Sequence, residues 1–305
     1  MDRSIELRRL VDEYIDSSEG WFLTHNIWSQ YNVKTRDAKK VVWERLGERV
    51  TKGDIEKSGQ KYRKRQKGRK LDAKANPEDK VKLNWPRSIE DDSHFMLDDV
   101  TLFKKAVIIV AGVSNNAKTT FCLNMVVENL EHPLKVKYIT NELADEELAD
   151  RLRSIHWINA WNSEGEYRFE AVELYENWQD EIEKDHINII DYLDPGENFY
   201  AVGQFIDIIR QRLRNGVAII AIQKGAGKYR GRDGKDHYSI NQYGVGGQFS
   251  EHRARLVLHL DPTDERGRLM LTIKKAKGSL TGRKFTFSVV NNGSQFHDIV
   301  EVKEE

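Results

Sequence analysis

The sequence predicts an α/β protein with a mainly parallel core sheet, preceded by a small helical module. Three observations support this fold class: helical spacing of apolar residues near the start, a polar basic stretch after it, and short apolar runs alternating with helical stretches from Ala106 onward. Apolar β-branched runs that alternate with helices are typical of βαβ units with buried parallel strands. The predicted division is a module over 1–65, a basic linker over 66–84 and an α/β domain over 85–305.

The first 65 residues predict three helices followed by a hairpin. Apolar side chains recur at helical spacing over 5–15, a short helix follows over Thr24–Tyr31, and a third begins after Thr35, which is placed as an N-cap. Gly53 ends this helix, and Ser58-Gly59-Gln60 favours a tight turn between two basic strands. This order is the outline of a winged helix-turn-helix. Four aromatic residues are expected to form its small core: Trp21, Phe22, Trp28 and Trp43.

The second part contains seven apolar runs with the length of strands. The last of them are joined by short turns and favour an antiparallel extension, whereas 143–185 is expected to be a helical insertion. The runs are Val107–Val110, Val136–Ile139, Ile187–Ile190, Val217–Ile222, Leu256–Leu260, Leu269–Ile273 and Phe285–Val290.

Charge and cysteine content limit the kinds of site and partner that this chain can have. The formal net charge is zero, yet the segment from Lys34 to Lys74 holds 16 Lys or Arg against 6 Asp or Glu, an asymmetry that indicates a nucleic-acid contact. The single cysteine, Cys122, excludes an intramolecular disulfide and a Cys-rich zinc site. No apolar run is long enough for a membrane span, so we expect a cytoplasmic protein without a membrane contact.

The most specific motif follows the strand that begins at Ala106. It reads Gly112-Val113-Ser114-Asn115-Asn116-Ala117-Lys118-Thr119-Thr120, close to the phosphate-binding pattern G-x-x-x-x-G-K-[ST]. Backbone N–H groups of such a loop and the next helix cradle phosphates, Lys118 would reach the β and γ phosphates, and the Thr119 hydroxyl would coordinate Mg²⁺. Ala117 replaces the second glycine, which costs roughly 1 kcal/mol if that position needs a positive φ.

Three later strands end in polar side chains that complete such a site. Asp191 follows the run Ile187–Ile190 and would hold the metal shell, as in a Walker B motif. Glu142 follows a second strand and would act as general base on the attacking water. Gln223 ends a third strand and would sense the γ phosphate. A strand end is often polar only because the chain leaves the core, but these three strand ends in series with the 112–120 loop favour an ATPase site.

This order of motifs resembles the RecA-like P-loop ATPases, and within them the C-terminal domain of DnaB-type replicative helicases, over about residues 85–290. The resemblance implies that a K-x-R-x-G segment supplies cations to the nucleotide on a neighbouring subunit. Here that segment is Lys275-Ala276-Lys277-Gly278, with lysine where the family has its arginine finger. Lysine is a point charge without the planar fork of arginine, so transactivation would be weaker or altered.

Two basic regions are candidate nucleic-acid contacts. The Gly- and Lys-rich stretch after Gln223 is expected to be a mobile basic loop, and the resemblance implies that such loops face nucleic acid. The alternative is a surface loop whose charge only keeps the protein in solution. The first module offers a second contact through its third helix and wing, although winged helices also bind protein. The nominated residues are Lys224, Lys228, Arg230 and Arg232 in the loop, and Lys39, Lys40, Arg63 and Arg65 in the module.

We therefore expect an ATPase that uses ATP and Mg²⁺, binds DNA and assembles as a homo-oligomeric ring or filament. Single-stranded DNA would lie at the ATPase loops, and a duplex could lie at the winged helix. Two alternatives remain at this point. One is a nucleotide-dependent switch or loader that assembles on DNA without translocation, which Ala117 and the lysine finger favour. The other is a signalling ATPase of the KaiC-like branch with a protein-binding winged helix.

Overall fold

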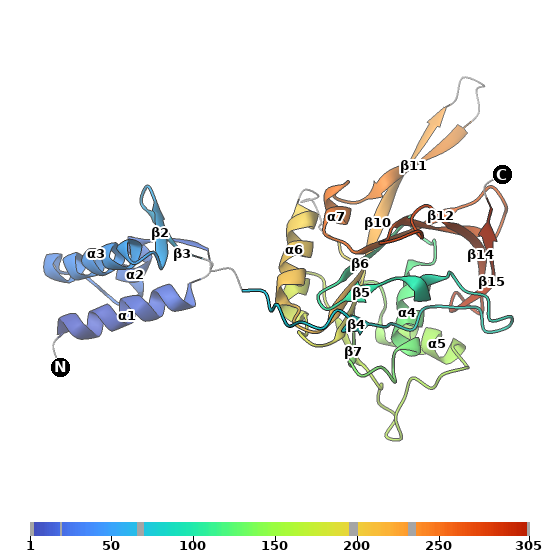
Figure 1. Cartoon of the computed structure of the whole chain (residues 1–305), viewed down its shortest axis with the longest axis horizontal. Coiled ribbons are helices and arrows are strands. Elements are labelled where there is room, and N and C mark those ends of the chain that lie inside the picture. Colours follow the sequence, from blue (N-terminus) through green and yellow to red (C-terminus); the bar gives the residue numbers. More distant parts are fainter. Residues whose placement is uncertain (1–2, 19, 66–69, 195–200, 231–235, 304–305) are drawn as a thin grey trace. The chain divides into compact units, whose positions relative to one another are not determined.

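The computed structural model describes residues 3–18, 20–65, 70–194, 201–230 and 236–303 (Figure 1). The chain forms two compact units, Met1–Ala75 and Asn76–Glu305, each with its own hydrophobic core. Within the described residues, no helix combines the length and apolar character needed to cross a membrane.

The first unit combines three helices with a three-stranded antiparallel sheet of order β1-β3-β2. The Thr35 hydroxyl accepts a hydrogen bond from the Ala38 N–H at 3.3 Å, so it is the N-cap of the third helix. Gly59 takes a φ of +58° in the hairpin turn, a backbone region that favours glycine. The elements are α1 Arg3–Ser17, β1 Trp21–Leu23, α2 Thr24–Gln30, α3 Arg36–Thr51, β2 Ile55–Ser58 and β3 Lys61–Lys64.

The four aromatic residues that were expected in the core of this unit are not all buried. Phe22 is buried, but Trp21 and Trp43 expose 44% and 51% of their surface, so these two tryptophans do not belong to the core. Apolar residues from all three helices and from the hairpin fill the interior instead. The fully buried ones are Val11, Ile15, Ile27, Val42, Leu46 and Ile55.

The second unit is built on a ten-stranded sheet of order β15-β14-β13-β12-β6-β10-β9-β7-β8, with β11 paired to β10. The strands from β12 to β8 are parallel, and β13 to β15 continue the sheet as an antiparallel extension. The mainly parallel core and its extension therefore confirm the predicted α/β class. The strands are β6 Val107–Gly112, β7 Val136–Thr140, β8 Glu170–Glu173, β9 Ile187–Asp191, β10 Val217–Arg230, β11 Asp236–Gly244, β12 Leu256–Pro262, β13 Leu269–Lys275, β14 Lys284–Val290 and β15 Gln295–Val302.

Both faces of the central strands are covered. Along β6, Val107 and Ile109 belong to the apolar cluster that includes α6, while Ile108 and Val110 belong to the cluster that includes α4. This two-sided burial explains why β6 is a continuous apolar run rather than an alternating one. The remaining elements of the unit are α4 Lys118–Glu128, α5 Asp145–Ser154, α6 Val202–Arg212, α7 Phe249–His252, the 3₁₀ turns Leu97–Asp99 and Trp178–Glu181, and the short strands β4 Lys80–Val81 and β5 Leu102–Phe103.

Three sequence expectations are corrected in this unit. The segment 143–185 is not a helical insertion, because only α5 is an α-helix and the chain then adds β8 to the parallel sheet. The Gly- and Lys-rich stretch after Gln223 continues β10 as a β-hairpin with β11, which extends away from the main sheet (Figure 1). Residues 80–84, expected in the linker, join the second unit, where β4 pairs with β5 and Leu83 is buried.

Candidate functional site

The loop between β6 and α4 is shaped by a close backbone approach and by two left-handed residues. A Cβ on Gly112 would stand 2.9 Å from the Leu260 carbonyl oxygen of β12, so only glycine fits where the loop leaves the sheet. Asn115 and Ala117 take φ values of +61° and +62°. Asparagine tolerates this region, but alanine there costs about 1–2 kcal/mol, so the Ala117 position is one that would favour glycine.

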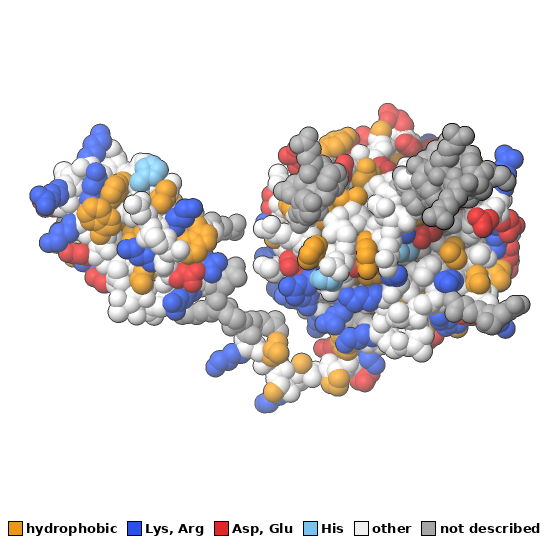
Figure 2. All heavy atoms as spheres, turned by 90° about the horizontal axis from the view of Figure 1, so that it is seen from above, with side chains coloured by type: hydrophobic (Ala, Val, Ile, Leu, Met, Phe, Trp, Pro, Cys, Tyr) orange, Lys and Arg blue, Asp and Glu red, His pale blue; other side chains and the backbone are white. Residues whose placement is uncertain are grey.

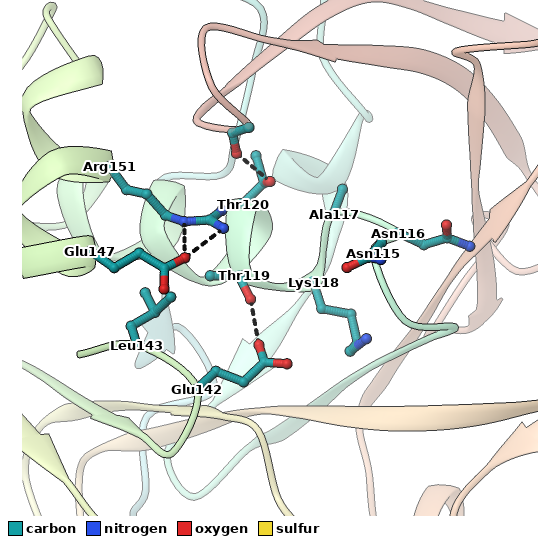
Figure 3. A pocket seen from close by; sticks show the side chains of 11 residues that line it. Asn115, Asn116, Ala117, Lys118, Thr119, Thr120, Glu142, Leu143, Glu147 and Arg151 are labelled. Carbon is teal, nitrogen blue, oxygen red and sulfur yellow. Dashed lines mark hydrogen bonds and ion pairs between the residues drawn. The ribbon is translucent and has the colours of Figure 1, made fainter.

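A pocket of about 360 Å³ opens in front of this loop (Figure 3). Lys118 lines it, and its ammonium donates a hydrogen bond to the Val113 carbonyl at 2.9 Å. Burial lowers the pKa of Lys118, and the nearby carboxylates of Glu142 and Asp191 oppose this effect. The lining is strongly polar and consists of Asn115, Asn116, Ala117, Lys118, Thr119, Thr120, Glu142, Leu143, Glu147, Arg151 and Gly293.

Two carboxylates from separate strands meet at the Thr119 side chain. The Thr119 hydroxyl lies 2.9 Å from Glu142 Oε2 and 3.4 Å from Asp191 Oδ1. Glu142 is exposed and follows β7, whereas Asp191 is fully buried at the end of β9. The adjacent parallel strands β7 and β9 place these two acids at the same sheet edge as the loop. The three residues nominated from separate parts of the sequence are therefore brought together.

Asp191 has a further partner that the sequence did not reveal. The Tyr138 hydroxyl, from the middle of β7, donates a hydrogen bond to Asp191 Oδ2 at 2.8 Å. Burial raises the pKa of Asp191 to about 6, and the hydrogen bond from Tyr138 acts in the opposite direction. Because Tyr138 holds one carboxylate oxygen, the other is left to face Thr119. Sequence reasoning could not find this contact, since Tyr138 looks like any aromatic residue inside a buried strand.

The donor set fits a hard divalent cation. Mg²⁺ prefers oxygen ligands and usually takes one or two protein carboxylates, with phosphate oxygens and water completing its shell. Thr119, Asp191 and Glu142 supply a hydroxyl and two carboxylates within one small region. Among the described residues, no group of three His, Cys, Asp or Glu side chains could hold a metal by itself. A cation here would therefore need oxygens from a bound ligand.

In the middle of β10, two consecutive residues that the sequence placed in different roles have different surroundings. Gln223 pairs in register with Gly112, so it stands beside the start of the loop. Lys224, nominated for nucleic acid, is instead buried and its ammonium lies 2.6 Å from Asp261 Oδ1. It also lies 3.4 Å from His259 Nδ1, while His259 Nε2 contacts Glu251 at 2.8 Å. Lys224 is therefore corrected to a residue of a buried polar network.

Two of the other nominated residues of this stretch lie on the hairpin. Lys228 and Arg230 are in β10, where they pair in register with Tyr238 and Asp236 of β11. Arg232 lies outside the described residues. The hairpin thus gives two of these nominated positions a defined strand backbone in place of the expected loop.

Lys275 and Lys277 lie on another basic surface. The Lys275 ammonium donates to the carbonyl oxygens of Glu251 and His252, at 3.0 and 3.1 Å. Burial lowers the pKa of Lys275, and the nearby Arg255 acts in the same direction. Neither lysine lines the pocket at the 112–120 loop of its own chain. They line a separate pocket of about 280 Å³ together with Arg210, His252, Arg253, Ala254, Arg255 and Ala276.

The nominated cations of the first unit lie on α3 and the hairpin. Lys39 lies over the Trp28 ring at 4.6 Å, and Lys40 is 73% exposed, with Glu44 at 3.9 Å. Arg63 pairs with Glu56 and lies over the Trp21 ring at 5.0 Å, while Arg65 is exposed after β3. All four side chains belong to surface elements of this unit.

Comparisons with known proteins give likenesses in structure only. No protein-family model matches the chain, and no curated protein matches it. Among solved structures, the chain is similar to the crystal structure of the RadB recombinase, with 15% sequence identity and a TM-score of 0.44. The match covers 67% of this chain and 94% of the other. The interpretation of the site therefore depends on the geometry of this chain.

Proposed function

We propose that the chain is a RecA-like ATPase that binds ATP with Mg²⁺ in the pocket of the 112–120 loop. The observation that carries this proposal is the meeting of Glu142 and Asp191 at the Thr119 hydroxyl, next to Lys118. Loop N–H groups and the start of α4 would bind phosphates, and Lys118 would reach the β and γ phosphates. Thr119 and Asp191 would hold Mg²⁺, which neutralises developing charge on the phosphates.

The remaining roles follow from exposure and position. Glu142 is exposed at the pocket, so it can accept a proton from the attacking water as general base. Gln223, beside the start of the loop, would sense the γ phosphate. Lys275 and Lys277 would act on the nucleotide of a neighbouring subunit, because they line a different pocket from that of the loop. This arrangement needs a homo-oligomer, either a ring or a filament.

We propose DNA as the partner, and the first unit as a winged helix that contributes to its binding. Support comes from the element order α1-β1-α2-α3-β2-β3 and from the basic side chains of α3 and the hairpin. Lys228 and Arg230 of β10, together with Arg232, would contact single-stranded DNA. Phosphate contacts of this kind predict an affinity that falls steeply with salt.

A switch that assembles on DNA without translocation is the second candidate. The observation that favours it is Lys275, whose ammonium is held by two backbone carbonyls and which lacks the planar fork of arginine. Such a cation would stabilise the transition state of a neighbour's nucleotide less well. A strand-displacement assay separates the candidates, because a motor unwinds DNA and a switch only assembles on it.

The proposal is tested with the purified full chain. We expect Mg²⁺-dependent ATP turnover that rises when single-stranded DNA is added, together with a larger assembly by light scattering. Equilibrium binding of a non-hydrolysable ATP analogue is measured in parallel. A chain that binds no nucleotide in the presence of Mg²⁺ would rule out the proposed site, and nucleotide binding without turnover would favour the switch.

The Tyr138–Asp191 contact predicts a pH effect on nucleotide binding. Asp191 must be ionised to hold Mg²⁺, so we expect affinity for the Mg²⁺-bound analogue to fall as the pH drops through about 6. Tyr138→Phe removes a hydrogen bond that lowers the pKa of Asp191, so the midpoint should move to higher pH and more Mg²⁺ should be required. Isothermal titration across this pH range measures both shifts.

The stability of the folded chain should show the opposite pH dependence. The folded pKa of Asp191 is raised above its unfolded value, so the folded chain binds more protons between about pH 4 and 6 and loses stability as the pH rises through that window.

Tyr175→Phe is the matched control for Tyr138→Phe, because Tyr175 is exposed and its hydroxyl bonds to Glu173. If the pH midpoint of analogue binding is the same in Tyr138→Phe as in the wild-type chain, the Tyr138 hydroxyl does not hold Asp191.

A further inference from the structure

Contacts between cations and aromatic rings are concentrated in the first unit. Lys39 lies over Trp28, Arg63 over Trp21 and Lys57 over Tyr62, at 4.6, 5.0 and 5.6 Å from the ring centroids. Roughly one energetically significant contact is expected in a unit of about this length. Figure 2 shows hydrophobic side chains beside Lys and Arg on the surface of this unit. The pairing of cations with rings is therefore a surface property that needs an explanation.

On α3, the arginines that face α1 are already neutralised. Arg45 contacts Asp12 at 2.5 Å and Glu48 at 2.7 Å. Arg49 lies 3.7 Å from Asp12 and 3.4 Å from Asp16. These arginines are held within the unit by acids of α1 and α3, so they are poorly placed to bind an external anion.

Side chains on a different face of α3 remain available to bind a ligand. Arg36, Lys39, Lys40 and Trp43 follow the spacing i, i+3, i+4 and i+7, which places them on one face of the helix. Arg36, Lys40 and Trp43 are all exposed, and Trp43 packs edge-on against Trp28 with 5.4 Å between ring centroids. We name Arg36, Lys39, Lys40, Trp43 and Trp28 the tryptophan stripe.

The composition of the tryptophan stripe points to one ligand chemistry. Its cations suit phosphates, while a half-exposed indole suits a flat aromatic partner such as a nucleobase. In a duplex the base faces are stacked on one another, so an indole can stack only on a base that is unpaired. An acidic protein surface would use the cations but offers no reason for the exposed ring.

We propose that the tryptophan stripe binds an unpaired segment of nucleic acid, with Trp43 stacking on a base and Arg36 and Lys40 contacting phosphates. This inference deepens the nucleic-acid part of the proposed function and changes its substrate at the first unit from a duplex to a single strand or frayed end. It does not depend on nucleotide hydrolysis, because none of its residues lies in the second unit.

The test uses the full chain without nucleotide, and fluorescein-labelled oligothymidylate and a duplex of equal length as probes. Trp43→Ala should weaken single-strand binding roughly 5- to 150-fold, the loss expected for one stacked base, with an unchanged salt slope. The duplex should be affected much less. Trp43→Phe should retain most of the affinity, and Lys40→Ala should reduce the salt slope by about 0.7.

Two further readouts make the result specific to the stripe. Single-stranded DNA should quench less tryptophan fluorescence in Trp43→Phe than in the wild-type chain. Tyr175→Ala is the matched control, because Tyr175 is also an exposed aromatic residue but lies in the second unit, and it should leave binding unchanged. Trp43 is half exposed, so its truncation leaves the core of the unit in place, which a melting curve checks.

Three outcomes would overturn the inference. Equal losses on duplex and single strand would exclude stacking on an unpaired base. Unchanged single-strand affinity in Trp43→Ala would leave a protein partner as the better explanation of the stripe. An affinity lost alike in Trp43→Phe and Trp43→Ala would exclude a role for the ring itself. Absence of ATP binding by the wild-type chain would reject the proposed ATPase while leaving these DNA measurements interpretable.

Discussion

Glu142→Gln should retain ATP binding but lower ATP turnover by about 100- to 10,000-fold, the range expected when a general base is removed. Glutamine keeps the size and hydrogen-bonding capacity of the side chain, so the contact with Thr119 at 2.9 Å can persist. What it loses is the ability to accept a proton. A steady-state ATPase assay and analogue binding on the same preparation measure the two effects separately.

A matched control for this substitution lies four residues further along the chain. Glu146 is an exposed acid in the first turn of α5 and does not line the pocket, so Glu146→Gln should leave turnover unchanged. Equal turnover in Glu142→Gln and the wild type would mean that the base lies elsewhere. Loss of analogue binding in Glu142→Gln would instead indicate that Glu142 takes part in holding the metal.

The parallel core was predictable because buried strands leave a clear local signature. β6 and the first part of β10 are continuous apolar runs with β-branched residues, and β9 is apolar up to Asp191 except for the buried Asn188, which follows from their burial on both faces. Polar residues at the ends of such strands must lie at one sheet edge, which made the nomination of Glu142, Asp191 and Gln223 possible. By contrast, the strand β1 was not predicted, because its three residues are too few for any periodic pattern.

The expectations that the structure corrects depend on contacts between residues far apart in the sequence. Such contacts leave no pattern in the local sequence. The stretch after Gln223 is rich in glycine and lysine and resembles a loop, yet cross-strand hydrogen bonds with β11 make it a strand. Lys224 resembles its basic neighbours, but the partner that buries it, Asp261, is 37 residues away. Trp43 was expected in the core, whereas its place on α3 leaves it 51% exposed.

Lys118→Ala should reduce turnover by about 100- to 1,000-fold, the loss typical when one charge-stabilising group is removed from a transition state. Lys118 is the cation at the start of α4, and the only other cation of the described pocket lining, Arg151, is already paired with Glu147 at 3.0 Å. No other described side chain of that lining can therefore replace its ammonium on the phosphates. We also expect weaker binding of the ATP analogue, measured by isothermal titration.

Lys104→Ala provides the comparison, because Lys104 is exposed before β6 and lies 3.6 Å from Asp79 on the surface of the same unit. It should keep both turnover and analogue affinity, while circular dichroism checks that both variants are folded. Normal turnover in Lys118→Ala would contradict the site itself, since the phosphates would then be bound without the one unpaired cation that the described lining offers. A loss of turnover with unchanged analogue affinity would place the contribution of Lys118 in the transition state alone.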